Sequence, residues 1–189
     1  MTAINPFTIL VDTREQGRYW FAGLRQDKAD GGRPLCVDTE YGTLSTGDYS
    51  IAGSSPDGRP WSDLVCVERK SFEDLISTLA SRRDDFKAEH ARMASRKFAA
   101  VVIEASWTDI FEREHYSRLP RRNVYRTAIS WQVRYRVPWM FMGSRGLAEA
   151  TTFRILEKFW REHNEHITVC DRRASALAGT NTSFHSTAR

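Results

Sequence analysis

Three charged residues, Glu68, Arg69 and Lys70, follow directly on an apolar run at positions 64–67. A run of this kind is typical of a strand that is covered on both faces of a sheet. Because side chains alternate along a strand, Glu68 and Lys70 should share one face while Arg69 points to the other. A carboxylate beside an amine at a strand end can coordinate a hard metal ion and act on a water molecule. The triplet therefore predicts a hydrolytic site.

A second carboxylate should complete this site, because Mg²⁺ is usually held by one or two carboxylates together with water and substrate phosphate. Asp48 follows the turn-forming Gly47 at the start of another expected strand and could be the second ligand. Asp12 and Glu15, at the end of the first expected strand, could add further negative charge. Ligands that are all oxygen favour Mg²⁺ or Mn²⁺ over zinc.

Asp74 has two interpretations. It stands three residues after Ser71, the expected N-cap of the next helix, where negative charge is favourable. It could also belong to the active site. The sequence alone leaves both interpretations open.

The elements that must position these residues follow from hydrophobic periodicity and turn residues. We expect strands at 8–12, 34–41, 48–52, 64–67, 99–104 and 139–142. We expect helices at 19–24, from Ser71 onward, at 84–96, at 123–136 and at 147–163. Strands that alternate with helices predict an α/β sandwich with a mixed sheet. We expect one domain over 1–170 and a Ser/Thr/Ala-rich tail without regular structure over 171–189.

Composition limits the class of protein. A chain of 189 residues, with 41% hydrophobic and 28% charged residues, is long enough for one soluble domain with a sizeable core. The net charge of +4 is compatible with a nucleic-acid partner. No apolar run reaches the roughly 20 residues of a membrane helix, and the first residues do not resemble a signal peptide. We therefore expect a cytoplasmic protein that does not enter a membrane.

The order of the charged residues resembles a known signature. The nuclease domain of the XPF-type structure-specific endonucleases carries Gly-Asp…Glu-Arg-Lys-x-x-x-Asp, which is represented here by Gly47-Asp48, Glu68-Arg69-Lys70 and Asp74. The resemblance covers about residues 7–165. It implies a restriction-endonuclease-like (PD-(D/E)XK) fold, which is a three-layer α/β/α sandwich with a mixed central sheet. It also implies a DNA endonuclease in which Asp48 and Glu68 hold Mg²⁺ or Mn²⁺ and Lys70 orients the attacking water.

Two departures from the family pattern stand out. Arg82 occupies the glycine position of the family's Leu-x-x-Gly-Arg, while Arg83 aligns with its arginine. The stretch between Asp48 and Glu68 is long and rich in turn residues, so we expect an extended hairpin there. The helicase or helix-hairpin-helix domains of larger members do not fit in this length. We therefore expect a stand-alone nuclease of bacterial or phage type.

A basic segment predicts where DNA would lie. Residues 115–136 contain six arginines and no acidic residue. On the expected helix, Arg122 and Arg126 lie opposite the apolar stripe and should contact the DNA backbone. Arg14 and Arg83 are further candidates, because guanidinium pairs with phosphate in a bidentate fork. The nearby Ile129 and Val133 could instead mark a dimer surface, since the resemblance implies partners that pair through their nuclease domains.

These observations lead to one principal hypothesis and two alternatives. The principal hypothesis is a metal-dependent endonuclease that cuts branched or single-strand/double-strand junction DNA, in repair or recombination, as a homodimer or with a nuclease or helicase partner. One alternative is a catalytically weak or inactive DNA-binding scaffold of the same fold, against which the intact acidic motif argues. The other is a sequence-specific restriction-type enzyme with the same site chemistry.

Overall fold

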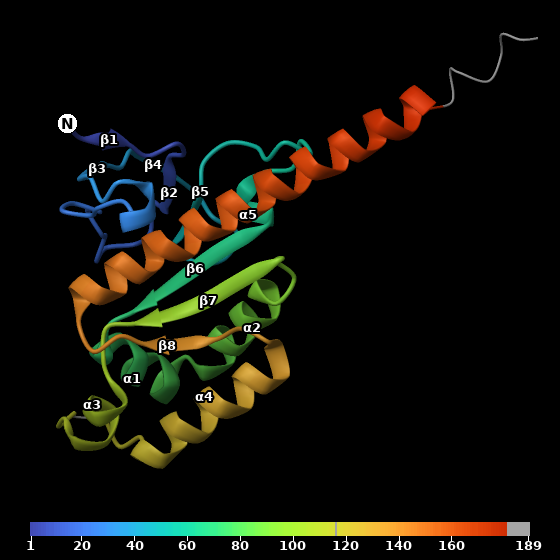
Figure 1. The fold of residues 1–189 in the computed structure, drawn as a ribbon. Coiled ribbons are helices and arrows are strands. Elements are labelled where there is room, and N and C mark those ends of the chain that lie inside the picture. The colour runs from blue at the N-terminus through green and yellow to red at the C-terminus, as the bar shows by residue number, and fades with distance from the viewer. Residues whose placement is uncertain (116, 181–189) are drawn as a thin grey trace, which may run out of the picture.

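The computed structural model describes residues 1–115 and 117–180, with the surroundings of side chains described up to residue 165. The chain folds around a six-stranded mixed sheet in the order β4-β2-β5-β6-β7-β8 (Figure 1). The strands are β2 (Ile9–Asp12), β4 (Thr39–Gly42), β5 (Tyr49–Ile51), β6 (Val65–Lys70), β7 (Phe98–Ile103) and β8 (Trp139–Phe141). Strand β5 runs antiparallel to both β2 and β6, whereas β6, β7 and β8 are parallel to one another. A separate parallel pair consists of β1 (Ala3–Ile4) and β3 (Leu35–Cys36).

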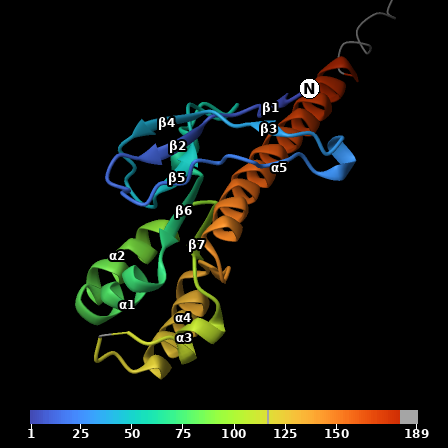
Figure 2. The ribbon, with the colours of Figure 1, turned by 90° about the vertical axis from the view of Figure 1, so that its left-hand side faces the viewer.

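Helices cover both faces of this sheet, so the fold has three layers. Figures 1 and 2 show α1, α2 and α4 on one face and α5 running across the other. The α-helices are α1 (Phe72–Ser81), α2 (Arg83–Met93), α3 (Trp107–Glu112), α4 (Arg121–Tyr135) and α5 (Arg145–Thr180), and short 3₁₀ turns lie at Lys28–Asp30 and Trp61–Asp63. In the part of the chain that the structure describes, no helix is both long and apolar enough to cross a membrane.

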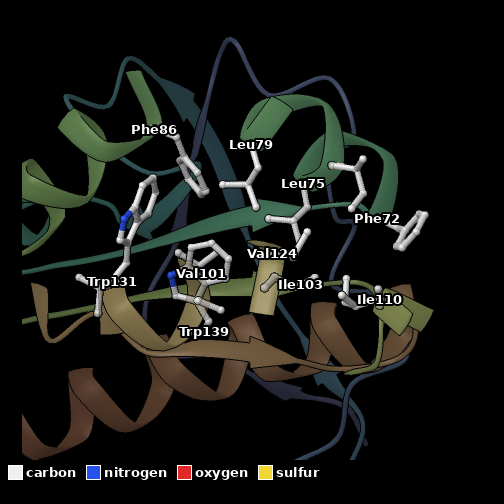
Figure 3. Close-up of a cluster of buried hydrophobic side chains, with 14 of the residues drawn as sticks. Phe72, Leu75, Leu79, Phe86, Val101, Ile103, Ile110, Val124, Trp131 and Trp139 are labelled. Carbon is white, nitrogen blue, oxygen red and sulfur yellow. The ribbon is translucent and has the colours of Figure 1, made fainter. Parts of the chain in front are cut away.

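The core between the sheet and α1, α2 and α4 follows from the predicted helical spacing. Leu75 and Leu79 of α1 and Val124 of α4 are buried against β7 (Figure 3). His90 is fully buried in the same core, where its Nε2 accepts a hydrogen bond from Trp139 Nε1 at 2.8 Å. Burial lowers the pKa of His90 to about 4, so this imidazole is neutral and serves packing.

The core on the α5 face uses the alternate residues of the same central strand. Val65 and Val67 of β6 point towards Phe153 and Leu156 of α5, and all four are fully buried. Strand β6 is therefore covered on both faces, as its apolar run predicted. This burial holds the charged end of β6 rigidly within the sheet.

The helix expected at 19–24 is wrong. Tyr19 and Phe21 are buried while Trp20 between them is exposed, so the side chains alternate with a period of two rather than the helical 3.6. The strand expected at 34–41 is also wrong as one element. It divides into β3, which pairs with β1, and β4, which pairs with β2.

Two further differences concern helices. Helix α3 was not expected; its six residues begin at a capping box formed by Ser106 and Asp109, a signal too local to show in the periodicity. Helix α5 runs on to Thr180, past residue 171, where we expected the chain to lose regular structure. The rest of that expected tail, 181–189, lies outside the described residues.

Candidate active site

Strand alternation divides the charged triplet as predicted. Glu68 and Lys70 lie on the α1/α2 face of β6, and Lys70 Nζ is 2.6 Å from Glu68 Oε1. Both side chains are buried, with 3% of Glu68 and 9% of Lys70 exposed. Arg69 points to the opposite face, where its guanidinium lies 5.6 Å from the centre of the Tyr19 ring.

Asp48 is brought opposite Glu68 by the pairing of β5 with β6. The backbone N–H of Asp48 donates to the Val67 carbonyl at 2.9 Å, and Asp48 Oδ2 accepts from the Arg69 backbone N–H at 2.7 Å. Gly47 makes this approach possible, because its φ of +75° is left-handed and a Cβ there would lie 3.0 Å from the Cβ of Cys66. The glycine before Asp48 therefore has a steric reason.

Asp74 contacts Lys70 as well as belonging to a helix start. Its Oδ2 lies 3.1 Å from Lys70 Nζ. The helix cap is made by Ser71, whose side chain accepts from the Asp74 backbone N–H at 3.1 Å. The capping interaction uses the backbone of Asp74 and leaves its carboxylate to hold Lys70, together with a contact to Arg82 at 3.3 Å.

The electrostatics of the site follow from burial of like charges. Burial and the nearby Glu15 carboxylate raise the pKa of Asp48 to about 7. Burial and the neighbouring Asp48 carboxylate also raise the pKa of Glu68 well above its usual range. Burial alone would lower the pKa of Lys70, but the carboxylates of Glu68 and Asp74 outweigh it and raise that pKa. Lys70 therefore stays charged at neutral pH, while Asp48 and Glu68 hold their protons more tightly than exposed carboxylates do.

Arg69 is the centre of a network on the other face of β6. Its Nε and Nη2 donate to the two carboxylate oxygens of Glu104 at 2.8 and 3.0 Å, and its Nη1 lies 3.3 Å from Glu15. Arg145 reaches the same Glu104 carboxylate at 3.1 Å. A Cβ at Gly17 would collide with the Arg69 guanidinium, so a larger residue there would displace that side chain from its place beside Glu15.

The Asp12 carboxylate makes its hydrogen bonds with Arg14 and Leu44 rather than with Asp48 or Glu68. Its carboxylate accepts from Arg14 Nε and Nη2 at 2.9 and 2.8 Å and from the Leu44 backbone N–H at 2.7 Å. Burial would raise the pKa of Asp12, but these hydrogen bonds outweigh it and hold that pKa below its usual range. Of the two acidic residues expected to add charge, the structure places Glu15 in the Arg69 network and Asp12 under the loop at Leu44.

A model of the ERCC4 domain matches residues 11–153. The chain belongs to the ERCC4-domain family. Two solved structures are similar to it. XPF from Aeropyrum pernix is 19% identical over 82% of this chain, with a TM-score of 0.52. XPF from Aeropyrum pernix in complex with DNA is 18% identical over 84% of this chain, with a TM-score of 0.51. The chain spans 60% and 66% of the lengths of those two chains. No curated relative matches the sequence.

These comparisons confirm the expected XPF-type nuclease domain and its restriction-endonuclease-like fold, a three-layer α/β/α sandwich with a mixed central sheet. The matched span contains the whole charged constellation described above. It also contains Glu104 and Arg145, which we did not single out from the sequence. The position of Glu104 was the signal that could have found it, because it directly follows β7 as the charged triplet ends β6. The Glu104 N–H donates to the Lys70 carbonyl at 2.9 Å, so the two strand ends lie side by side.

Glu89 of the ERCC4 domain is a further acidic residue that sequence reasoning missed. It lies on α2, one turn beyond Phe86, whose ring centre is 5.0 Å from Lys70 Nζ. Its charge contributes to raising the pKa values of both Asp48 and Glu68. The helical spacing from the buried Phe86 was the signal that could have found it.

The arginines predicted to bind DNA fall into two places. Arg83 and Arg126 line one pocket of about 450 Å³ between α1, α2 and α4, together with Leu79, Leu119, Asn123, Thr127 and Ser130. Within the described residues, neither guanidinium has an acidic partner; Arg83 lies over the Trp131 ring at 5.1 Å. Arg122 is exposed at the start of α4. Arg14 lies elsewhere, beside Asp12, with 68% of its side chain exposed.

The donor set at the acidic pair fits a hard divalent cation. Asp48 and Glu68 offer only carboxylate oxygens, and their mutual repulsion is the kind that a cation between them would relieve. Among the residues that the structure describes, no cluster of three His, Cys, Asp or Glu side chains could hold a metal ion by itself. A cation at Asp48 and Glu68 would therefore keep water or phosphate as further ligands, as Mg²⁺ usually does.

Proposed function

We propose that this ERCC4 domain is a metal-dependent DNA endonuclease that uses Mg²⁺ or Mn²⁺ and cuts at branched or single-strand/double-strand junctions. One observation carries the proposal. The buried Lys70 ammonium is held between Glu68, at 2.6 Å, and Asp74, at 3.1 Å, on the same face of the sheet as Asp48. A charged amine in fixed contact with a carboxylate that could bind a metal can orient an attacking water and stabilise charge that develops on a phosphate.

Each residue has a role that follows from its position. A divalent cation at Asp48 and Glu68 would polarise the scissile phosphate and lower the pKa of a bound water. Lys70 orients that water and stabilises the negative charge that develops on the phosphate oxygens. Asp74 keeps the Lys70 ammonium in place. Arg69, on the far side of β6, positions the strand end through Glu104 and does not touch the reacting atoms.

DNA as the substrate is supported by the basic pocket and by the family. Arg83 and Arg126 converge without acidic partners in the described structure, and such a pair suits a backbone phosphate. Along α2, Arg83 is one turn from Phe86, and the Phe86 ring lies under the Lys70 ammonium. A duplex held at the pocket would therefore run close to the proposed catalytic residues. One of the similar solved structures, XPF from Aeropyrum pernix, is a complex with DNA.

A cleavage assay tests the proposal. The purified protein is incubated with flap, splayed-arm and plain duplex DNA in Mg²⁺, in Mn²⁺ and in EDTA. We expect cleavage of the branched substrates that needs the metal and that Lys70→Ala abolishes. Lys97→Ala is the matched control, because Lys97 is an exposed lysine at the opposite end of the parallel strands.

Three other results would contradict the proposal. Full activity of Lys70→Ala would remove the proposed catalytic role of the lysine. DNA binding without metal-dependent cutting would favour an inactive scaffold of the same fold. Cutting of plain duplex at one recurring sequence would favour a restriction-type enzyme.

A further inference from the structure

Trp20 is unusual among the six tryptophans of the chain because it is exposed. Its exposed fraction is 76%, whereas the other five are buried or half-buried. It stands at a cleft of about 650 Å³ whose other lining residues are Thr13, Arg14, Glu15, Gln16, Gly17, Arg18 and Arg145. A large aromatic surface beside three arginines is therefore open to solvent.

The backbone around Trp20 is fixed so that the indole must face outward. Tyr19 and Phe21 on either side are each only 2% exposed, and their rings pack against Tyr49 at 5.1 and 5.7 Å. The Tyr19 N–H donates to the Tyr49 hydroxyl at 2.9 Å, and the Phe21 N–H donates to the Glu149 carboxylate. Phe21 has a φ of +53°, a left-handed conformation that is rare for a bulky residue and strains the backbone. Tyr19 and the strained Phe21, both buried, thus hold Trp20 at the rim of the cleft.

Two arginines of the cleft are anchored mainly by neutral partners. Arg18 donates from Nε to the Glu15 carbonyl at 2.8 Å and from Nη2 to the Thr13 carbonyl at 3.1 Å, and within the described residues it pairs with no carboxylate. Arg145 donates from Nη2 to the Gly17 carbonyl at 3.0 Å, while its Nη1 lies 3.1 Å from Glu104. Carbonyl partners fix a guanidinium without cancelling its charge. The cleft therefore presents ordered positive charge to a ligand.

The cleft adjoins the proposed active site. Glu15 lines it, and the charge of Glu15 raises the pKa of Asp48. Arg69 Nη1 lies 3.3 Å from the same Glu15 carboxylate. Arg14 lines it as well, with its charge offset by Asp12. A strand of DNA that leaves the acidic pair on this side would pass Arg18, Arg145 and Trp20.

We propose that this cleft binds an unpaired nucleotide of the DNA substrate, with its base stacked on Trp20 and its phosphate on Arg18 and Arg145. The inference rests on the proposed function and names the part of the substrate that must be single-stranded. Base–aromatic stacking tolerates any sequence because every base has a flat face, and it needs a base that is not already stacked in a duplex. A polar, basic cleft with one exposed ring suits a nucleotide better than the apolar segment of a protein partner.

The test compares Trp20→Ala, Trp20→Phe and wild type for binding to an oligothymidylate and to plain duplex in EDTA. Phe111→Ala is the matched control, since Phe111 is an exposed aromatic residue (45%) on α3, outside this cleft. We expect Trp20→Ala to weaken binding of the single strand roughly ten-fold, the effect of losing one base–aromatic stack, and to leave duplex binding unchanged. Trp20→Phe should retain most of the affinity, and the control all of it.

A spectroscopic readout accompanies the binding curves. The oligothymidylate should quench the tryptophan fluorescence of the wild type, and Trp20→Phe should lose that quenching while it still binds. Equal affinities of wild type and Trp20→Ala for the single strand, in a protein that cleaves junction DNA, would overturn the subsite and leave the proposed function standing. A wild type that neither binds nor cuts DNA would overturn both.

Discussion

The Glu104 carboxylate accepts hydrogen bonds from both Nε and Nη2 of Arg69, at 2.8 and 3.0 Å. Arg69 belongs to β6, and Glu104 directly follows the neighbouring parallel strand β7. Both side chains are close to 90% buried, at 12% exposed for Arg69 and 11% for Glu104. The pair ties the end of β6, which carries Glu68 and Lys70, to the end of β7. We therefore expect the geometry of the acidic pair on one face of β6 to depend on this ion pair on the other face.

Removing this carboxylate should weaken the fold and slow cleavage together. We expect Glu104→Ala to lower the free energy of unfolding by about 3 kcal/mol, because it leaves the buried Arg69 with only Glu15 at 3.3 Å. Glu73→Ala, which removes an exposed pair with Arg113, should cost less than about 1 kcal/mol. Chemical denaturation measures the free energy of unfolding of the two variants, and the cleavage assay measures the rate of Glu104→Ala. Equal losses for the two variants would contradict a structural role for the Glu104–Arg69 pair.

The metal dependence of activity should be steeply sensitive to pH. Burial raises the pKa of Asp48 to about 7, and a cation binds only the ionised carboxylate. At limiting Mg²⁺ we therefore expect the cleavage rate to fall about ten-fold for each unit that the pH drops below about 7. Saturating Mg²⁺ should move this decline to lower pH. A flat rate between about pH 5 and pH 8 at limiting Mg²⁺ would contradict proton competition at Asp48.

The same pKa shift fixes the sign of the stability change. The folded protein holds the Asp48 proton more tightly than the unfolded chain does. Without metal, the contribution of Asp48 to the free energy of unfolding therefore falls as the pH rises from about 4 through about 7. Added Mg²⁺ should raise the melting temperature clearly at about pH 8 and hardly at about pH 5. Asp48→Asn should lose this response, and Asp57→Asn, at an exposed position between β5 and β6, should keep it. Thermal denaturation with and without Mg²⁺ measures the effect.

Gly47 stands in the turn before Asp48, and Gly53, which follows β5, is its matched control. Their φ angles are +75° and +76°, so an alanine at either position carries the same conformational strain. Only at Gly47 would the new Cβ also lie 3.0 Å from the Cβ of Cys66, whereas Gly53 has nothing within 4 Å. We expect Gly53→Ala to cost about 1 kcal/mol and Gly47→Ala about 2–3 kcal/mol, with a loss of cleavage at Gly47 alone. Identical melting temperatures would show that the contact with Cys66 relaxes freely.

Arg83 and Arg126 should act as one phosphate site. Each single alanine variant should weaken duplex binding and reduce the slope of log affinity against log salt by about one, the effect of one lost phosphate contact. Because both line the same pocket, the double variant should lose little more than either single one. Arg33→Ala, at an exposed position near Gln26, is the control. Additive losses would indicate two separate phosphates, and an unchanged salt slope would remove the pocket from the DNA path.

Local patterns in the sequence determined the central strand, the faces on which its charged residues lie, and the start of the following helix. The apolar run before Glu68 predicted a doubly covered strand, and the period of two then separated Glu68 and Lys70 from Arg69, as the structure confirms. The N-cap at Ser71 was equally local. These features are visible because a strand end, a cap and a side-chain alternation depend on residues that are close in the chain.

The tertiary structure alone decided which distant residues meet. The partner of Arg69 is Glu104, and the Asp12 carboxylate accepts from the Leu44 backbone N–H, because strand order and register bring these distant residues together. The segment around Trp20 was misread as helical for the same reason. Its two buried aromatics fill a space made by Tyr49, and only the assembled core shows that this space exists. The charged triplet could be found in the sequence, but its support and its neighbouring cleft come from long-range packing.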